Sequence, residues 1–162
     1  MATWIFQGSP SRYNVAGAID ALRKISWEVT AFKREISEGH KVYMWVSGAG
    51  AGIVASGVIT CDPRNVESLP WMRHFDLPSV EEPSNSYFGV SITLDRWFTQ
   101  ERVSRETLLK NERTNQLTVL RSRGGTNFQV TPMQDEAIEY LIAQGCGRAS
   151  PVGGVQGQGL LL

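Results

Sequence analysis

The sequence predicts an α+β fold in which a small curved β-sheet or barrel carries helices at its periphery. Alternating apolar and polar residues, which are typical of strands, occupy the middle of the chain, whereas helical spacing of apolar residues occurs near both ends. Successive strands without helices between them do not suit a doubly wound parallel sheet. Short strands also leave exposed edges, and closing the sheet into a barrel removes them.

The amino-terminal quarter predicts one strand and one helix. The apolar run 3–6 is expected to form a strand that ends at the Gly-Ser-Pro triplet 8–10. Apolar residues recur at helical spacing from Val15 to Ile25, and the side chain of Asn14 is suited to cap that helix. Residues 26–36 show no clear pattern.

A β-hairpin is expected at residues 41–60. The segment 41–47 alternates clearly, and a glycine-rich connector leads from it into a second strand at 52–60. Gly57 interrupts that second strand, which indicates a bulge or a close approach of another backbone segment. The alternation assigns the side chains of the first strand to opposite faces: Val42, Met44 and Val46 to one, and Tyr43, Trp45 and Ser47 to the other.

The middle of the chain predicts a long irregular loop before the pattern of strands resumes. Residues 62–86 contain four prolines and no clear period, and loops of this length are often functional. Residues 87–94 alternate again and predict a strand. A short helix is expected around 104–110, and a further strand near 117–120.

The last helix carries the strongest local signal. Thr131 is suited to cap it, Pro132 suits its first position, and Gln134 completes a capping box. Gly145 is the expected stop. We therefore expect one domain at residues 1–145 and a glycine-rich linker or tail at 146–162, to which a further domain could be joined.

The composition suits a single globular domain. The 162 residues are 41% hydrophobic and 20% charged, which supplies enough apolar material for a core. The sequence shows no apolar run near the ~18 residues of a membrane-spanning helix, so no membrane partner is expected. The opening residues lack the pattern of a secretory signal. Cys61 and Cys146 predict free thiols in a reducing compartment, with a disulfide as the alternative, and this favours a cytoplasmic location.

The formal net charge is zero. Proteins that coat nucleic acid without specificity are usually strongly basic, because phosphate neutralisation drives their affinity. Any phosphate contact must therefore come from a local patch. Two basic clusters are candidates, with an ordinary solvated surface as the alternative for each: Arg23, Lys24, Lys33 and Arg34, and then Arg102, Arg105, Lys110, Arg113, Arg121 and Arg123.

The sequence patterns of enzymes and metal sites are not found. His40 and His74 have no partners at ligand spacing, so we expect neither a metal site nor a cofactor. No serine lies in a Gly-x-Ser-x-Gly elbow, and the adjacent carboxylates 81–82 and 135–136 are typical of solvated surface charge. The glycine run 48–52 leads into a strand, whereas a dinucleotide-binding loop leads into a helix. The sequence therefore favours a binding protein without catalytic residues.

The tryptophans allow two interpretations. They can pack the core, which suits Trp4 best. Alternatively, some of them form a cage whose aromatic faces hold a base extruded from a duplex, recovering roughly 1–3 kcal/mol of stacking per base. Trp27, Trp45 and Trp71 lie on separate segments and are able to converge on one cavity.

Several segments, in order, resemble the EVE family. WIFQGSPSRY at 4–13 resembles the opening strand and proline-containing turn of EVE domains, and Trp27-Glu28-Val29 resembles their internal Trp-x-Val element. EGHKVYMWVSGAGAGIVASGVI at 38–59 resembles the family hairpin, although His40 stands where the family usually has aspartate. GGTNFQVTP at 124–132, followed by an acidic helix, resembles the carboxy-terminal signature, in which Asn127 and Phe128 are expected to have structural roles.

This resemblance implies a PUA-like β-barrel related to the YTH readers of methylated adenine in RNA. It implies a non-catalytic domain that flips a modified base, 5-methylcytosine or 5-hydroxymethylcytosine in DNA, into an aromatic pocket. It also implies a specificity role in modification-dependent restriction, beside a fused or associated nuclease or NTPase. A modified-RNA reader, a small nucleotide-processing enzyme on a related barrel and a ligand-sensing module remain alternatives.

By motif position, the resemblance also implies which residues bind the base. The expected base-binding residues are Trp27, Val29, Trp45, Ser47 and Trp71. The expected phosphate-binding residues, chosen from the basic clusters, are Lys33, Arg34, Arg121 and Arg123.

Overall fold

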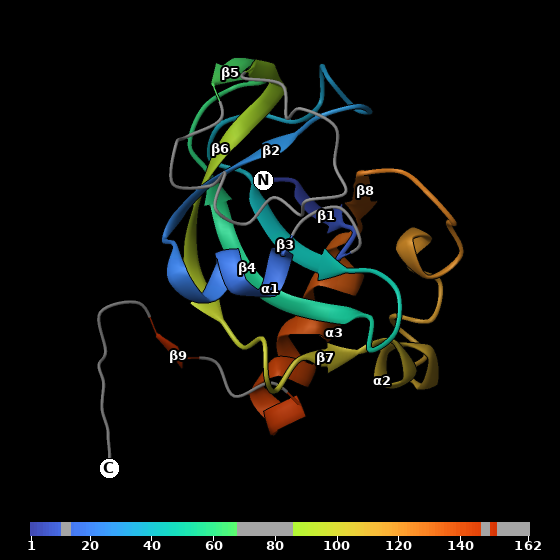
Figure 1. Ribbon diagram of the computed structural model, residues 1–162. Coiled ribbons are helices and arrows are strands. Elements are labelled where there is room, and N and C mark those ends of the chain that lie inside the picture. The colour runs from blue at the N-terminus through green and yellow to red at the C-terminus, as the bar shows by residue number, and fades with distance from the viewer. Residues whose placement is uncertain (11–13, 68–85, 147–149, 152–162) are drawn as a thin grey trace.

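The computed structural model describes residues 1–10, 14–67, 86–146 and 150–151. Figure 1 shows a curled sheet with helices packed around it. The elements in chain order are β1 (Thr3–Gly8), α1 (Val15–Ala21), β2 (Lys24–Glu28), β3 (Lys41–Val46), β4 (Gly52–Ile59), β5 (Arg64–Glu67), β6 (Ser86–Trp97), β7 (Val103–Ser104), α2 (Arg105–Lys110), the 3-10 turn η2 (Thr118–Leu120), β8 (Asn127–Val130), α3 (Pro132–Leu141), the π-helical turn η3 (Ile142–Cys146) and β9 (Ser150–Pro151).

The strands form one mixed sheet in the order β2-β6-β4-β3-β1-β8. β1 and β3 run parallel, and the other described pairs run antiparallel. β5 and β9 add to β6, and β7 adds to β4. A parallel pair needs a long crossover connection, which α1, β2 and the segment after β2 supply here.

The side chain of Asn127 joins the two ends of this strand order. Its oxygen accepts hydrogen bonds from the backbone N–H groups of Thr30 and Ala31 at 2.8 and 3.2 Å, and its nitrogen donates to the Glu28 carbonyl at 3.1 Å. Glu28 ends β2 and Asn127 begins β8. These bonds therefore link the terminal strands and curl the sheet into a half-barrel.

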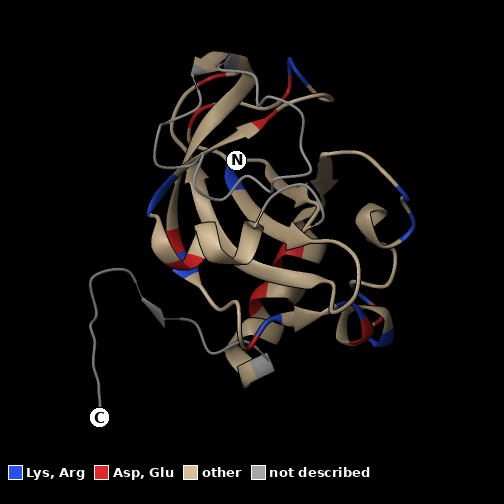
Figure 2. Cartoon of the chain, viewed as in Figure 1, with Lys and Arg blue, Asp and Glu red and all other residues tan. Residues whose placement is uncertain are grey.

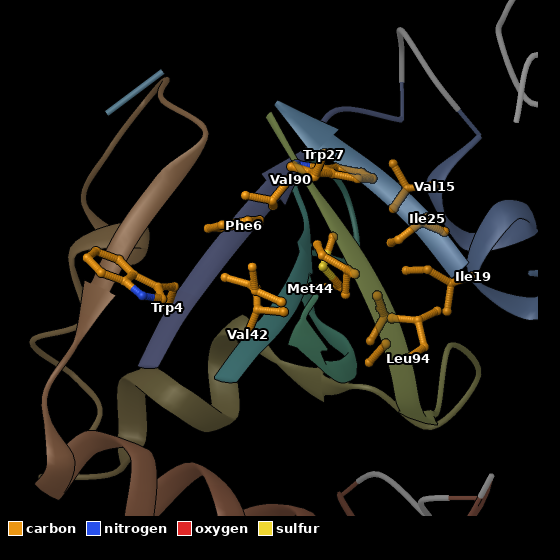
Figure 3. Close-up of a cluster of buried hydrophobic side chains, with 14 of the residues drawn as sticks. Trp4, Phe6, Val15, Ile19, Ile25, Trp27, Val42, Met44, Val90 and Leu94 are labelled. Carbon is orange, nitrogen blue, oxygen red and sulfur yellow. The ribbon is translucent and has the colours of Figure 1, made fainter. Parts of the chain in front are cut away.

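The sheet separates two apolar cores. The inner core lies inside the curl and combines side chains from β1, α1, β2, β3, β4 and β6. Figure 3 shows part of it, with Phe6, Met44 and Leu94 pointing into the same space. The outer core lies on the opposite face, where residues of α2, η2 and α3 cover β1, β3 and β8. Phe128, expected to be structural, is buried there.

The hairpin predicted at 41–60 is confirmed, and both faces of its first strand are buried. Val42, Met44 and Val46 belong to the inner core, and Tyr43 and Trp45 belong to the outer core, as the alternation predicted. Gly57 shows both of the predicted features. The register of β4 against β6 shifts beside it, and a Cβ at this position would lie 2.5 Å from the carbonyl oxygen of Thr93.

Several other local predictions are confirmed. The Asn14 side chain caps α1, the short helix expected around 104–110 is present as α2, and the complete capping box begins α3. Gly145 takes a positive φ of 82° where the last helix ends. Cys61 is a free thiol.

In the part of the chain that the structure describes, no helix is long and apolar enough to cross a bilayer.

Three local predictions are wrong. The helix predicted from Val15 to Ile25 ends at Ala21, because Leu22 is extended and Ile25 reaches the inner core from β2. In place of the strand predicted near 117–120, residues 118–120 form a 3-10 turn, in which Val119 and Leu120 are both buried although a strand would point them to opposite faces. The predicted loop 62–86 contains β5. Trp71 lies outside the described residues.

The division of the chain at residue 145 stays a prediction. Within the predicted tail, the structure describes Cys146 and the two residues of β9. β9 pairs with β6 at Arg96 and Trp97.

Candidate nucleic-acid interface

Trp27 lies on β2, beside the end of β1. Its indole Nε1–H donates a hydrogen bond to the Gln7 carbonyl at 3.3 Å. The ring packs so closely on Gly8 that a Cβ there would lie 2.7 Å from both Trp27 Cζ2 and Val15 Cγ2. Figure 3 shows the ring beside Val90. Trp27 is only 9% exposed, so most of its surface belongs to the inner core.

Ser47 reaches Gly8 from the neighbouring strand. Its N–H and its hydroxyl both donate to the Gly8 carbonyl, at 3.0 and 3.3 Å. Gly48 follows with a positive φ of 87°, and a Cβ built on it would lie 3.8 Å from Pro10 Cγ. Trp27, Ser47, Gly48 and Pro10 therefore gather around Gly8, and we call these five residues the Gly8 corner.

The other predicted base-binding residues lie elsewhere. Val29 is 2% exposed and shares the inner core with Trp27. Trp45 is also 2% exposed but belongs to the outer core, so the sheet separates the two indoles. As folded, Trp27 and Ser47 are brought together through Gly8, whereas Trp45 is not part of that group.

The predicted phosphate-binding residues form two separate pairs. Lys33 and Arg34 are exposed in the segment 30–40 between β2 and β3, which we call the basic arm. Arg121 and Arg123 are exposed in the loop between η2 and β8, where Arg121 donates to the side-chain oxygen of Gln116. Figure 2 shows blue segments at the tip of the arm and, apart from them, on the loop before β8.

The basic arm has a well-defined path. Phe32 takes a positive φ of 58°, which is rare for a side chain of this size, and its carbonyl accepts the Ile36 N–H at 3.0 Å. The Phe32 ring packs on Trp4 with 5.1 Å between ring centroids. Ile36 is buried in the inner core. Lys33 and Arg34 therefore lie on a turn that is fixed at both sides.

A network of charged side chains attaches α3 to the sheet. Lys41 donates to Asp135 at 2.9 Å and to Glu139 at 2.6 Å, and Arg96 donates to Glu139 at 2.7 Å. The Tyr43 hydroxyl lies 2.6 Å from Asp135 and 2.7 Å from Glu139. Burial and these two hydrogen bonds raise the pKa of Tyr43. Its phenol stays protonated near neutral pH, so the network is suited to hold the helix and not to act as a base.

The expectation that residues 135–136 carry solvated surface charge is wrong for Asp135. Its carboxylate is used to hold α3 against β3, because the side chains of Lys41 and Tyr43 reach it from that strand. The neighbouring Glu136 does match the expectation, with a side chain 79% exposed and a single salt bridge to Arg113 among the described residues.

Glu139 is expected to make the fold sensitive to acid. Burial opposes its ionisation, but hydrogen bonds from Arg96, Lys41 and Tyr43 outweigh burial and lower the pKa of Glu139 from 4.5 to about 2. Such a carboxylate stabilises the fold fully above pH 4.5, and this contribution disappears as the pH falls through about 2. Because the side chain is partly exposed, we expect the free energy of unfolding to fall by about 1–2 kcal/mol through this group.

Urea unfolding measured at a series of pH values checks this expectation. Glu139→Gln should be less stable than the parent at neutral pH, and the difference should shrink in acid. Glu136→Gln, which removes an equal charge from the exposed face of α3, should follow the parent profile. Parallel profiles for Glu139→Gln and the parent would show that Glu139 does not carry the effect.

From the sequence, Gly8 was expected only to end the first strand. Its contact with Trp27 depends on how the sheet curls, because the two residues lie on strands that are not neighbours in the sheet. A glycine at a strand end, directly before Ser-Pro, was the available signal. Among the described residues, no three His, Cys, Asp or Glu side chains gather into a group that could hold a metal ion.

Solved structures share this fold over nearly the whole chain. A hypothetical protein from Leishmania major has a TM-score of 0.65 at 12% identity, covering 89% of this chain and 96% of that one. A protein from Pseudomonas syringae has a TM-score of 0.60 at 20% identity, covering 86% and 99%. Human THYN1, in a crystal structure with 5-methylcytosine containing DNA, has a TM-score of 0.59 at 13% identity, covering 87% and 97%.

These likenesses confirm the predicted fold class, an α+β, PUA-like curved barrel with peripheral helices. They also support the resemblance to the EVE family at the level of the fold. No protein-family model matches the sequence. No curated protein sequence matches it either.

Proposed function

We propose that this chain is a non-catalytic nucleic-acid-binding domain that reads a modified cytosine in DNA, either 5-methylcytosine or 5-hydroxymethylcytosine. One observation carries the proposal: the chain shares its fold, over 87% of its length, with human THYN1, whose crystal structure contains 5-methylcytosine DNA. The partly buried charged network around Glu139 is occupied in attaching α3, so among the described residues it does not offer a competing site.

The Gly8 corner is the proposed base-binding site. Trp27 supplies aromatic surface, and Ser47 supplies a hydroxyl within reach of the same glycine. An aromatic face recovers part of the stacking that a base loses when it is flipped from a duplex. Val29 and Trp45 are both too deeply buried to touch a base. We propose that they support the site indirectly, Val29 from the inner core and Trp45 from the outer core. Trp71 is proposed as the second wall.

The decisive experiment is a binding panel at a fixed, stated salt concentration. It contains identical duplexes and single strands with cytosine, 5-methylcytosine, 5-hydroxymethylcytosine or N6-methyladenine, in DNA and in RNA. A preference for a modified cytosine in duplex DNA is the expected result. Tighter binding to methylated RNA would identify an RNA reader instead, and no binding to any member would overturn the proposal.

The wider role follows from the same proposal. A reader without catalytic residues needs a partner to act on the DNA that it recognises. We propose that it serves as the specificity module of a modification-dependent restriction system, beside a fused or associated nuclease or NTPase, in the cytoplasm. Copurification of such a partner from cells that express the full protein tests this role.

The two basic pairs are the proposed phosphate contacts. Lys33→Ala with Arg34→Ala should weaken binding to modified and unmodified duplexes alike, because phosphate contacts position the protein and do not read the base. The slope of log affinity against log salt should fall by about one unit for each lost contact. Titrations at several salt concentrations measure both quantities.

A matched control removes the same charge from α2. Arg105→Ala with Lys110→Ala should leave the salt slope closer to that of the parent, because these residues lie away from the basic arm (Figure 2). A changed ratio of the two affinities with an unchanged slope would show that Lys33 and Arg34 read the base.

A further inference from the structure

Asn127 is a polar side chain with an unusual position. It is 3% exposed and begins β8, yet the side-chain hydrogen bonds described above go to Glu28, Thr30 and Ala31. We call these three residues the root of the basic arm. Thr30 and Ala31 are the first two residues of that arm, and Glu28, the last residue of β2, lies two residues before Thr30. A side chain from the far end of the sheet therefore fixes where the arm begins.

The rest of the arm is fixed by contacts that do not involve Asn127. Phe32 packs on Trp4, and Ile36 is inserted into the inner core. Near the other end, His40 Nδ1 accepts hydrogen bonds from Trp4 Nε1 at 3.1 Å and from the Ser37 N–H at 3.2 Å. The root is the part of the arm that Asn127 holds, and Lys33 follows it by only two residues.

The positions of Lys33 and Arg34 depend on this root together with Phe32 and Ile36, because Thr30 and Ala31 lead directly into the turn that carries them. Both side chains are long and exposed, so most of their freedom comes from their own rotamers and from the backbone that carries them. Fixing the backbone before binding reduces the ordering that the complex requires. Without Asn127, two N–H groups and one carbonyl would lose their side-chain partner at the point from which the arm extends.

We infer that Asn127 is a positioning residue for phosphate recognition, which holds the root of the basic arm so that Lys33 and Arg34 meet DNA as a preorganised pair. The inference rests on the proposed function, because it assigns these two residues to the DNA backbone. Asn127 itself does not touch the nucleic acid. It acts through the backbone of Glu28, Thr30 and Ala31.

The first test uses the free protein. Trypsin cleaves after lysine and arginine, so the rate of cleavage after Lys33 and Arg34 reports opening of the arm. Asn127→Ala should raise that rate by about tenfold or more, as expected when local opening becomes easier. Val130→Ala, which removes a buried side chain from the same strand without touching the arm, is the control. Equal rates in Asn127→Ala and Val130→Ala would overturn the inference.

The second test uses a double-mutant cycle in DNA binding. Asn127→Ala should weaken binding to unmodified duplex by about fivefold and lower the salt slope, as the loss of a phosphate contact does. In the Lys33→Ala/Arg34→Ala background, the same substitution should change affinity less than about twofold, since the residues that it positions are gone. Full additivity would overturn the inference while leaving the phosphate contacts in place.

A second variant and a second criterion separate a failure to fold, a failure of the phosphate contacts and a failure of the inference. If Asn127→Ala does not fold, Asn127→Ser replaces it, because the serine hydroxyl is uncharged and keeps a polar group at this buried position. Smaller changes in the same directions are then expected. If Lys33→Ala/Arg34→Ala does not alter DNA binding at all, the proposed phosphate contacts fail, and the inference fails with them.

Discussion

Replacement of Trp27 by alanine is expected to lower the free energy of unfolding by about 3–5 kcal/mol and to weaken binding of 5-methylcytosine DNA by about 1–3 kcal/mol. The loss of stability follows from the place of the indole in the inner core, against Gly8 and Val15. The loss of affinity follows from the proposed stacking of the base on this ring. Binding of unmodified duplex should fall much less, since phosphate contacts hold it.

Chemical denaturation and fluorescence anisotropy with paired duplexes measure the two effects separately. Trp27→Phe keeps an aromatic ring but loses the hydrogen bond to the Gln7 carbonyl, so both losses should be smaller. Val90→Ala, which removes a buried neighbour of the ring, should lower stability and keep the preference for modified DNA. A folded Trp27→Ala protein that still discriminates as well as the parent would exclude Trp27 as a wall of the site.

Replacement of Trp4 by alanine is expected to lower the free energy of unfolding by about 3–5 kcal/mol without changing the preference between modified and unmodified DNA. Trp4 is fully buried, donates to His40 and supports the Phe32 ring. Its loss leaves a cavity under the basic arm. Affinity for both duplexes should therefore fall together as the arm loosens.

Unfolding curves and the same paired titrations check the effect of Trp4→Ala. Trp4→Phe fills more of the cavity and should recover part of the stability. If Trp4→Ala changed the ratio of the two affinities, Trp4 would have a part in reading the base, and its assignment to structure alone would be wrong.

The sequence predicted best where short-range chemistry decides the structure. The capping box at Thr131 and Gln134 depends on residues three apart, and it forms as expected. The alternation of residues 41–47 depends on a period of two, and it correctly divided Tyr43 and Trp45 from Val42 and Met44. Both signals are local, so tertiary packing did not need to be known.

The sequence predicted least where distant segments meet. Ile25 has helical spacing from Leu22, but pairing of β2 with β6 places it in a strand. The curl of the sheet decides that Trp27 meets Gly8 and that Trp45 lies behind a different face. The left-handed backbone of Phe32 has no sequence signal, because phenylalanine rarely adopts it.

The pairing of β1 with β8 has a consequence for the order in which the molecule can be made. Residues 3–6 pair with residues 127–130, so β1 leaves the ribosome long before its partner strand β8. Until β8 emerges, a nascent chain has one long edge unpaired and no partner for the root of the arm. Contacts this distant in sequence also slow folding, because a large loop must close before they form. A chaperone that covers the open edge of β1 during synthesis would therefore protect the step at which aggregation competes with folding.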